Sequence, residues 1–229
     1  MRNLRVCTHI SLLASLFLLS TSCSKHKSEP LVINPTVNPI QYSVLVYLVT
    51  PTDASFNPQY YTAVKSCVLS LQTWYKAQMG NKTFTLNPVV VDTLTGLHNS
   101  SWYNSDNGLP LGGYGPYYNT LYEMHQLLGA NYDSTHYTYF VYVAADFPEV
   151  TIPRGLAVEG LGIIAGLTSK SPNFSIGASG HALGHAFGLP EPAGIENPDA
   201  IMSSGYPHYP NCIFTQAEKD SLNATPFFN

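Results

Sequence analysis

Two histidines four residues apart are the residues of this chain best suited to carry out chemistry. They lie in the segment Gly180-His181-Ala182-Leu183-Gly184-His185-Ala186-Phe187-Gly188-Leu189-Pro190-Glu191. On a helix, residues at this spacing lie one turn apart on the same face, so both imidazoles can reach one metal ion. Gly188 allows the chain to leave the helix in a left-handed conformation and to bring Glu191 toward the same ion. Two imidazoles and a carboxylate suit Zn²⁺, and three protein ligands leave one coordination position open.

The third ligand of the site has more than one candidate. Glu191 lies between Pro190 and Pro192, and the alternative is that it is a solvated turn residue. In that case the zinc shell would be completed by His208, Glu196 or Asp199. Tyr206 either packs against other residues or assists an oxyanion. His125 and His136 are expected to be surface or structural residues.

The histidine segment resembles the signature of the metzincin zinc peptidases, among which the matrixin-like members are the nearest match. His181, His185 and Gly188 match that signature. Downstream, Ala200-Ile201-Met202-Ser203-Ser204-Gly205 resembles the methionine turn that this family places beneath its metal, with Met202 as the methionine. The resemblance implies Zn²⁺ as the cofactor and a peptide or protein as the substrate or ligand. It also implies a zincin domain with an active-site helix and a small C-terminal subdomain after the methionine turn.

The chain departs from the metzincin pattern at two positions. The family's third ligand is histidine or aspartate, whereas the matching residue here is Glu191. The family's catalytic glutamate follows the first histidine, and that position is occupied by Ala182. General acid–base catalysis by such a group raises the rate about 10²- to 10⁴-fold. Without it, peptide hydrolysis is expected to be slow unless Glu159, Glu191 or Glu196 supplies the base from another direction. A metal-bound carboxylate such as Glu191 has reduced basicity, because the cation it coordinates withdraws its charge.

We therefore expect an inactive or weakly active peptidase scaffold. The alternative is a zinc-containing surface lipoprotein that binds peptides or glycans without cutting them. A third interpretation is a lipoprotein whose metal site is closed by four ligands and purely structural.

The pattern of apolar residues predicts an α/β or α+β fold in which helices pack on a mixed twisted sheet. Two helices are expected to pack on the sheet beside the active-site helix: one from the cap Asn57-Pro58 to Gly80, and one marked by Leu121, Met124 and Leu127/Leu128. Strands are predicted at 41–50, within 82–94, at 137–145 and at 163–167, and residues 98–118 are predicted to form a loop. The first helix is expected to bury an apolar stripe at Val64, Cys67/Val68, Leu71 and Trp74/Tyr75. Thr215-Gln216-Ala217-Glu218 indicates the cap and capping box of a helix after the methionine turn.

The N-terminus is typical of an exported lipoprotein. Arg2 and Arg5 precede an apolar stretch at 10–19, and the segment that ends at Cys23 resembles a bacterial lipobox, although Ser20 occupies the usual aliphatic position. We expect a signal peptide at 1–23, a tether at 24–40 and one metzincin-like domain at 41–229. The protein would then be lipid-anchored at Cys23 in the periplasm or on the cell surface, or alternatively secreted. The apolar stretch is too short for a transmembrane helix, which needs about 20 residues.

The composition argues against nucleic acid as a partner, and it does not decide whether the cysteines form a disulfide. Charged residues make up 10% of the 229 residues and the net charge is -4, so no basic surface is expected for nucleic acid. If Cys7 leaves with the signal peptide and Cys23 is acylated, Cys67 and Cys212 remain. In an oxidising compartment they form either a disulfide or two buried thiols.

Overall fold

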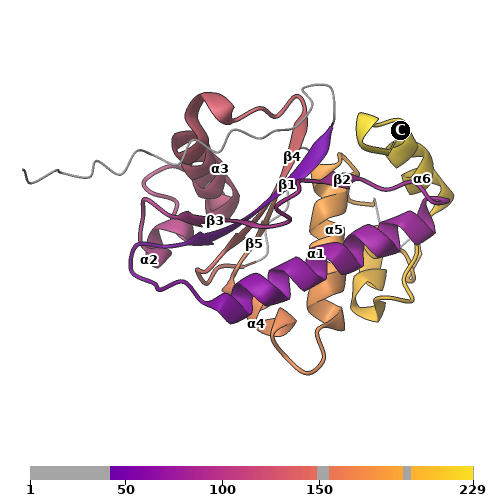
Figure 1. Cartoon of the computed structure of the whole chain (residues 1–229), viewed down its shortest axis with the longest axis horizontal. Coiled ribbons are helices and arrows are strands. Elements are labelled where there is room, and N and C mark those ends of the chain that lie inside the picture. Colours follow the sequence, from indigo (N-terminus) through magenta and orange to yellow (C-terminus); the bar gives the residue numbers. More distant parts are fainter. Residues whose placement is uncertain (1–41, 149–154, 193–196, 229) are drawn as a thin grey trace, which may run out of the picture. The chain divides into compact units, whose positions relative to one another are not determined.

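The structure, a computed structural model, describes residues 42–148, 155–192 and 197–228. The predicted signal peptide, Cys23, the tether and Glu196 lie outside these ranges. The main elements, shown in Figure 1, are β1 (Ser43–Thr50), α1 (Pro58–Gln78), β2 (Thr85–Leu86), β3 (Asp92–Thr95), α2 (Ser100–Tyr103), α3 (Gly115–Leu128), β4 (Tyr137–Val143), β5 (Leu156–Glu159), α4 (Leu161–Leu167), α5 (Asn173–Ala186) and α6 (Gln216–Asn223). Short single-turn segments lie at Gly129–Asn131, Ile201–Gly205, Tyr206–His208 and Pro226–Phe228.

The sheet is parallel in all the strand pairings of the described residues. β1 pairs with β2 and β3 along one edge and with β4 along the other, and β5 pairs with β4. The prediction of a mixed sheet is therefore wrong for these strands, although the coarser prediction of an α/β fold is confirmed. The physical reason is connectivity: α1 lies between β1 and β2, and α2 and α3 lie between β3 and β4. A helical crossover brings the chain back so that the next strand runs in the same direction as the previous one, as parallel pairing requires.

Helices cover both faces of the sheet. Alternate residues of β1 point to opposite sides, so Val44, Val46 and Leu48 join one core while Leu45, Tyr47 and Val49 join another. The first core contains residues of α1, α4 and α5, and the second contains residues of α2 and α3. In Figure 1, α3 accordingly lies away from α1 and α5, with the strands between them. Burial on both faces explains why β1 is a continuous apolar run rather than an alternating one.

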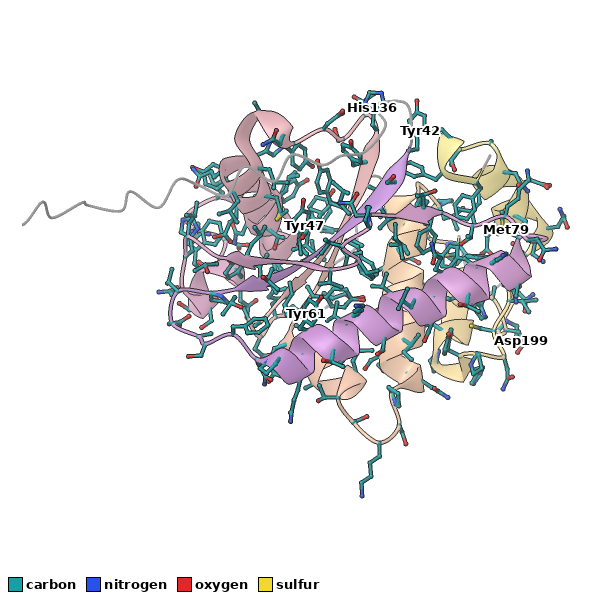
Figure 2. All side chains as sticks on the ribbon, in the orientation of Figure 1. Tyr42, Tyr47, Tyr61, Met79, His136 and Asp199 are labelled. Atoms are coloured by element: carbon teal, nitrogen blue, oxygen red, sulfur yellow. The ribbon has the colours of Figure 1, made fainter. Side chains whose placement is uncertain are left out.

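Aromatic rings fill much of the core on the α3 side. Tyr47, which is labelled in Figure 2, stacks on Tyr139 with ring centroids 6.4 Å apart, and Tyr132 also stacks on Tyr139, at 4.5 Å. Burial raises the pKa of Tyr132 to about 12, because the ionised phenolate is poorly solvated there. These rings thus act as packing groups with neutral hydroxyls.

Both long helices on the sheet follow their sequence signals. The Asn57 side chain accepts a hydrogen bond of 2.9 Å from the Gln59 amide and so caps α1. The apolar stripe of α1 is buried, as predicted from its spacing: Val64, Cys67, Val68, Leu71, Trp74 and Tyr75. The second predicted helix is α3, and it begins earlier than the apolar spacing alone indicated, at Gly115.

Residues 163–167 form part of helix α4, so the prediction of a strand there is wrong. Ile164 and Leu167 are buried at helical spacing. A short apolar run does not distinguish a strand from a buried helix by periodicity. The predicted loop at 98–118 likewise contains α2 and the start of α3.

The C-terminal segment packs against the end of α1. Thr215 and Glu218 form the predicted capping box of α6, in which the Thr215 amide donates to Glu218 Oε2 at 2.7 Å. Phe214 and Phe228 pack on the ring of Tyr75, with ring centroids 5.0 and 6.0 Å away. Among the residues that the structure describes, no helix combines the length and the apolar character needed to cross a membrane.

Candidate metal centre

His181 and His185 lie one turn apart on α5, a helix that is buried on all sides. Residues 175–186 of this helix are all buried, which requires neighbours to approach its backbone closely. Glycines permit this: a Cβ atom at Gly180 would lie only 2.8 Å from Leu71 of α1 and 2.9 Å from Ile201. Gly180, directly before His181, thus lets α5 pack closely between α1 and the Ile201–Gly205 turn.

The two imidazoles face each other through their Nε2 atoms, which are 3.0 Å apart. The Nδ1 atom of His181 lies 2.9 Å from the carbonyl oxygen of Ile201, and Nδ1 of His185 lies 2.8 Å from that of Leu189. Because a carbonyl oxygen only accepts hydrogen bonds, each Nδ1 carries the proton and each Nε2 presents a lone pair. Metal-binding histidines commonly have this arrangement, with the second nitrogen held by a backbone carbonyl.

Glu191 reaches the same point after the turn at Gly188. Gly188 has a φ of 98°, so the left-handed turn predicted at this position is confirmed. The Leu189 amide donates back to the Gly184 carbonyl at 3.1 Å, which closes the end of the helix. Glu191 Oε1 then lies 2.9 Å from Nε2 of His185 and 3.5 Å from Nε2 of His181. Its side chain is 62% exposed, so the carboxylate forms the solvent side of the cluster.

The geometry of the three donor atoms fits a single cation. Two ligand atoms about 2.0–2.1 Å from Zn²⁺ at the tetrahedral angle would be about 3.3 Å apart, close to the separations of 3.0, 2.9 and 3.5 Å observed here. Two lone pairs and a carboxylate at these distances repel one another unless a positive charge lies between them. Burial lowers the pKa of His181. The three donor atoms are close enough for one cation to contact all of them.

Met202 packs against the histidine helix α5. Its side chain is 1% exposed, and its sulfur lies against Gly184 between the two histidines along the chain. The turn is closed by a hydrogen bond of 2.9 Å from the Gly205 amide to the Ala200 carbonyl. The same turn supplies the Ile201 carbonyl to His181, so one segment both supports the helix and orients a candidate ligand.

The other predicted candidates are placed outside this cluster. In the described part of the chain, the group of side chains able to hold a metal comprises His181, His185 and Glu191, and it includes neither Asp199 nor His208. Glu159 is 1% exposed and is not part of that group. His125 packs on Tyr132 at 3.8 Å between ring centroids, and His136 pairs with Asp133 at 2.7 Å, in keeping with the structural roles expected for them.

Ala182 is fully buried and contributes only a methyl group. No carboxylate other than that of Glu191 belongs to the cluster within the described residues. The position beside the first histidine therefore offers no group that can accept a proton.

An aromatic wall beside the centre was not predicted. The ring of Tyr206 lies 5.3 Å from that of His181, and Phe174, which is 51% exposed, packs edge-on against Tyr206 at 5.7 Å. A pocket of about 340 Å³ lies next to Phe174 and is lined in part by Phe147, Ile163 and Glu159. The sequence gives no signal for this wall, because its rings come from residues 32 positions apart in the chain.

Cys67 and Cys212 are two free thiols, both buried, and not a disulfide. The sulfur of Cys67 lies 3.6 Å from the hydroxyl of Tyr142. Burial raises the pKa of Cys67 to about 12 and that of Cys212 to about 11. Both thiols therefore act as packing groups of low reactivity.

In a comparison with known proteins, no protein-family model matches the chain and no curated protein is a significant match.

Proposed function

We propose that this chain is a metzincin-like protein in which His181, His185 and Glu191 bind Zn²⁺, and that it has little or no peptidase activity because Ala182 replaces the general base. One observation carries this proposal. Two Nε2 atoms with their lone pairs directed at each other meet a carboxylate oxygen within 3.5 Å, on a helix supported by a buried methionine.

The chain's own groups have distinct roles in this proposal. Bound zinc would polarise a substrate carbonyl or a water molecule. The carbonyls of Ile201 and Leu189 orient the imidazoles, and the Glu191 carboxylate neutralises part of the metal's charge. Tyr206, whose ring packs on His181, and Phe174 beside it offer aromatic surface on which an apolar side chain of a peptide could pack.

Binding without cleavage follows from the position of Ala182. A hydrolytic step needs a group that takes a proton from the attacking water and returns it to the leaving amine. Glu191 serves poorly because coordination to the metal reduces its basicity. The zinc-containing, peptide-binding lipoprotein is therefore the second candidate, and the same buried methyl group favours it.

The test compares the chain with Ala182→Glu and with the matched control Ala182→Gln, which has the same shape but no base. All three proteins should contain zinc when purified from zinc-supplemented medium. Peptidase activity toward a mixed library of fluorogenic peptides should rise about 10²- to 10⁴-fold in Ala182→Glu alone. Equal activity in the glutamine variant, or absence of zinc from all three, would contradict the proposal.

Export and lipid anchoring through Cys23 form the second part of the proposal. Its support is the sequence pattern at 1–23. The test is incorporation of radiolabelled palmitate in a bacterial host that processes lipoproteins, compared with Cys23→Ser. Labelling of the parent chain and not of the variant is expected. A labelled Cys23→Ser chain, or an unlabelled parent released as a soluble protein, would exclude the anchor.

A further inference from the structure

A row of exposed tyrosines runs along the outer face of α3. Tyr114, Tyr118 and Tyr122 are 47%, 45% and 54% exposed. They are spaced four residues apart, and the Tyr118 amide bonds the Tyr114 carbonyl at 3.1 Å, which extends the helical spacing back to Tyr114. Successive positions are therefore offset by about 6 Å along the helix axis. Half-exposed aromatic rings in such a row are uncommon on a surface without a partner.

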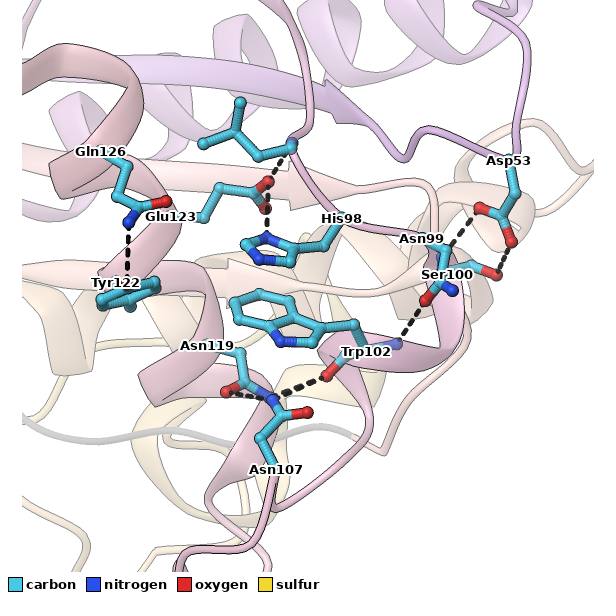
Figure 3. Close-up of polar contacts among 11 residues, drawn as sticks. Asp53, His98, Asn99, Ser100, Trp102, Asn107, Asn119, Tyr122, Glu123 and Gln126 are labelled. Carbon is cyan, nitrogen blue, oxygen red and sulfur yellow. Dashed lines mark hydrogen bonds and ion pairs between the residues drawn. The ribbon is translucent and has the colours of Figure 1, made fainter.

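The scaffold beneath this row, shown in Figure 3, is rigidly bonded. Tyr122 accepts a hydrogen bond of 2.7 Å from the Gln126 amide, one turn further along α3. Trp102, whose ring centroid is 6.4 Å from that of Tyr122, lies beside the row and is held face to face with His98 at 3.6 Å. Asn119 of α3 is buried and donates to the carbonyls of Trp102, Tyr103 and Ser105 at 2.9, 3.2 and 2.7 Å. Tyr122 and Trp102 are thus held in place before any ligand arrives.

The segment that carries the tyrosines has almost no exposed charge of its own, although the exposed carboxylate of Asp106 lies beside Gly115 at the start of α3. Residues 108–128 contain no lysine, arginine or aspartate, and their one glutamate, Glu123, is 1% exposed. His125 is the remaining titratable imidazole in this stretch. A neutral surface is complementary to a neutral ligand and provides no attraction for nucleic acid or for an anionic membrane.

The area available is small for a protein partner. An aromatic side chain buries about 150–250 Å² when fully covered, so three half-exposed tyrosines offer on the order of 300 Å². A stable protein interface needs about 800 Å² from each partner. A proline-rich peptide docks in a groove lined by aromatic rings, whereas these rings stand on the convex face of one helix. A linear chain of sugar units needs neither a groove nor a large area, because each unit can cover one ring.

We propose that the tyrosine face, defined as Tyr114, Tyr118 and Tyr122 with Trp102 beside them, binds a neutral polysaccharide. The apolar faces of successive sugar rings stack on the phenol rings, and the tyrosine hydroxyls and the Gln126 amide exchange hydrogen bonds with sugar hydroxyls. This function is independent of the metal centre, since α3 and α5 belong to cores on opposite faces of the sheet.

The experiment is native affinity electrophoresis of the full chain in gels containing hydroxyethyl cellulose, xylan, soluble starch or galactomannan. Polygalacturonate serves as an acidic control, and titration with an oligoproline peptide as a control for peptide binding. At least one neutral polysaccharide should retard the chain, equally with and without EDTA. The double variant Tyr118→Ala/Tyr122→Ala should bind it at least about tenfold more weakly.

Two further variants make the result specific. Tyr122→Phe keeps the ring and should retain most of the affinity. Phe56→Ala removes a ring that is 50% exposed elsewhere on the molecule and should change nothing. Circular dichroism should show all variants folded, because each substituted side chain is about half exposed. No retardation in any neutral polysaccharide, unchanged retardation of the double variant, or binding of oligoproline in place of polysaccharide would overturn the proposal.

Discussion

The sulfur of Met202 lies so close to the backbone of Gly184 that a Cβ atom at position 184 would collide with it. Gly184 directly precedes His185 on α5, and Met202 directly follows Ile201, whose carbonyl holds His181. The contact therefore couples the positions of both candidate ligand histidines to one turn of the chain.

Gly184→Ala should destabilise the protein by about 1–3 kcal/mol, because an added methyl in a packed core forces its neighbours apart. It should also weaken metal binding, since a shift of α5 against the Met202 turn disturbs the contact between His181 Nδ1 and the Ile201 carbonyl. Thermal denaturation and metal titration measure the two effects. The control is Gly162→Ala in α4, where a Cβ atom would meet nothing within 4 Å. The control should lose no stability and should keep its metal affinity. Equal behaviour of the two variants would refute the coupling.

Glu191→Gln should lower the affinity for zinc by at least about tenfold while preserving the fold, because it replaces a negatively charged ligand by a neutral one. Its side chain is 62% exposed, so the substitution should change the free energy of unfolding little. The matched control is Asp199→Asn, which removes a carboxylate outside the cluster. Competition with a zinc-responsive dye measures both. A larger loss in Asp199→Asn would indicate that the wrong carboxylate has been chosen as the ligand.

In a Cys7→Ser/Cys23→Ser background, the folded protein should not react with a thiol reagent at pH 8, and two thiols should react after denaturation without reductant. Cys67 and Cys212 are both 1% exposed, and burial raises the pKa of each above the usual value of 9.0. The denatured chain thus loses thiol protons first as the pH rises above 9.0, so this contribution makes stability fall with increasing pH. Cys67→Ala/Cys212→Ala should reduce that slope. Absence of reactive thiols in denaturant would indicate a disulfide instead.

Asn119→Ala should destabilise the protein by about 2–3 kcal/mol, because it leaves the buried carbonyls around Trp102 without a donor. Asn107→Ala removes an exposed residue whose amide donates to Trp102 O at 3.3 Å and to Asn119 Oδ1 at 3.0 Å, and it should cost less because the three bonds that Asn119 donates remain. Chemical denaturation followed by fluorescence measures both. If the two variants lost the same stability, Asn119 would not be the residue that fixes α2 on α3.

Much of the site was accessible from the sequence because its signals are local. The spacing of His181 and His185, the left-handed turn at Gly188 and the Thr215 capping box each depend on a few consecutive residues, and the structure contains all three. Glu191 could be placed only as one alternative among several, because its approach depends on how the chain continues after the turn.

What the sequence could not provide depends on contacts between distant segments. The parallel pairing of β1 with β2, β3 and β4 follows from helical crossovers that no single strand encodes. The run at 163–167 is apolar enough for a strand, yet it packs Ile164 and Leu167 as a helix. The carbonyls of Ile201 and Leu189 hold the imidazoles, and a backbone acceptor has no signature in the identity of its residue.

The central claim is that His181, His185 and Glu191 share one metal ion, and native mass spectrometry of the protein equilibrated with excess Zn²⁺ tests it most directly. The account predicts one zinc per folded chain, removed by EDTA, and no bound zinc in His181→Ala or His185→Ala. A chain that binds no zinc, or a His181→Ala/His185→Ala double variant that still binds one, would contradict it.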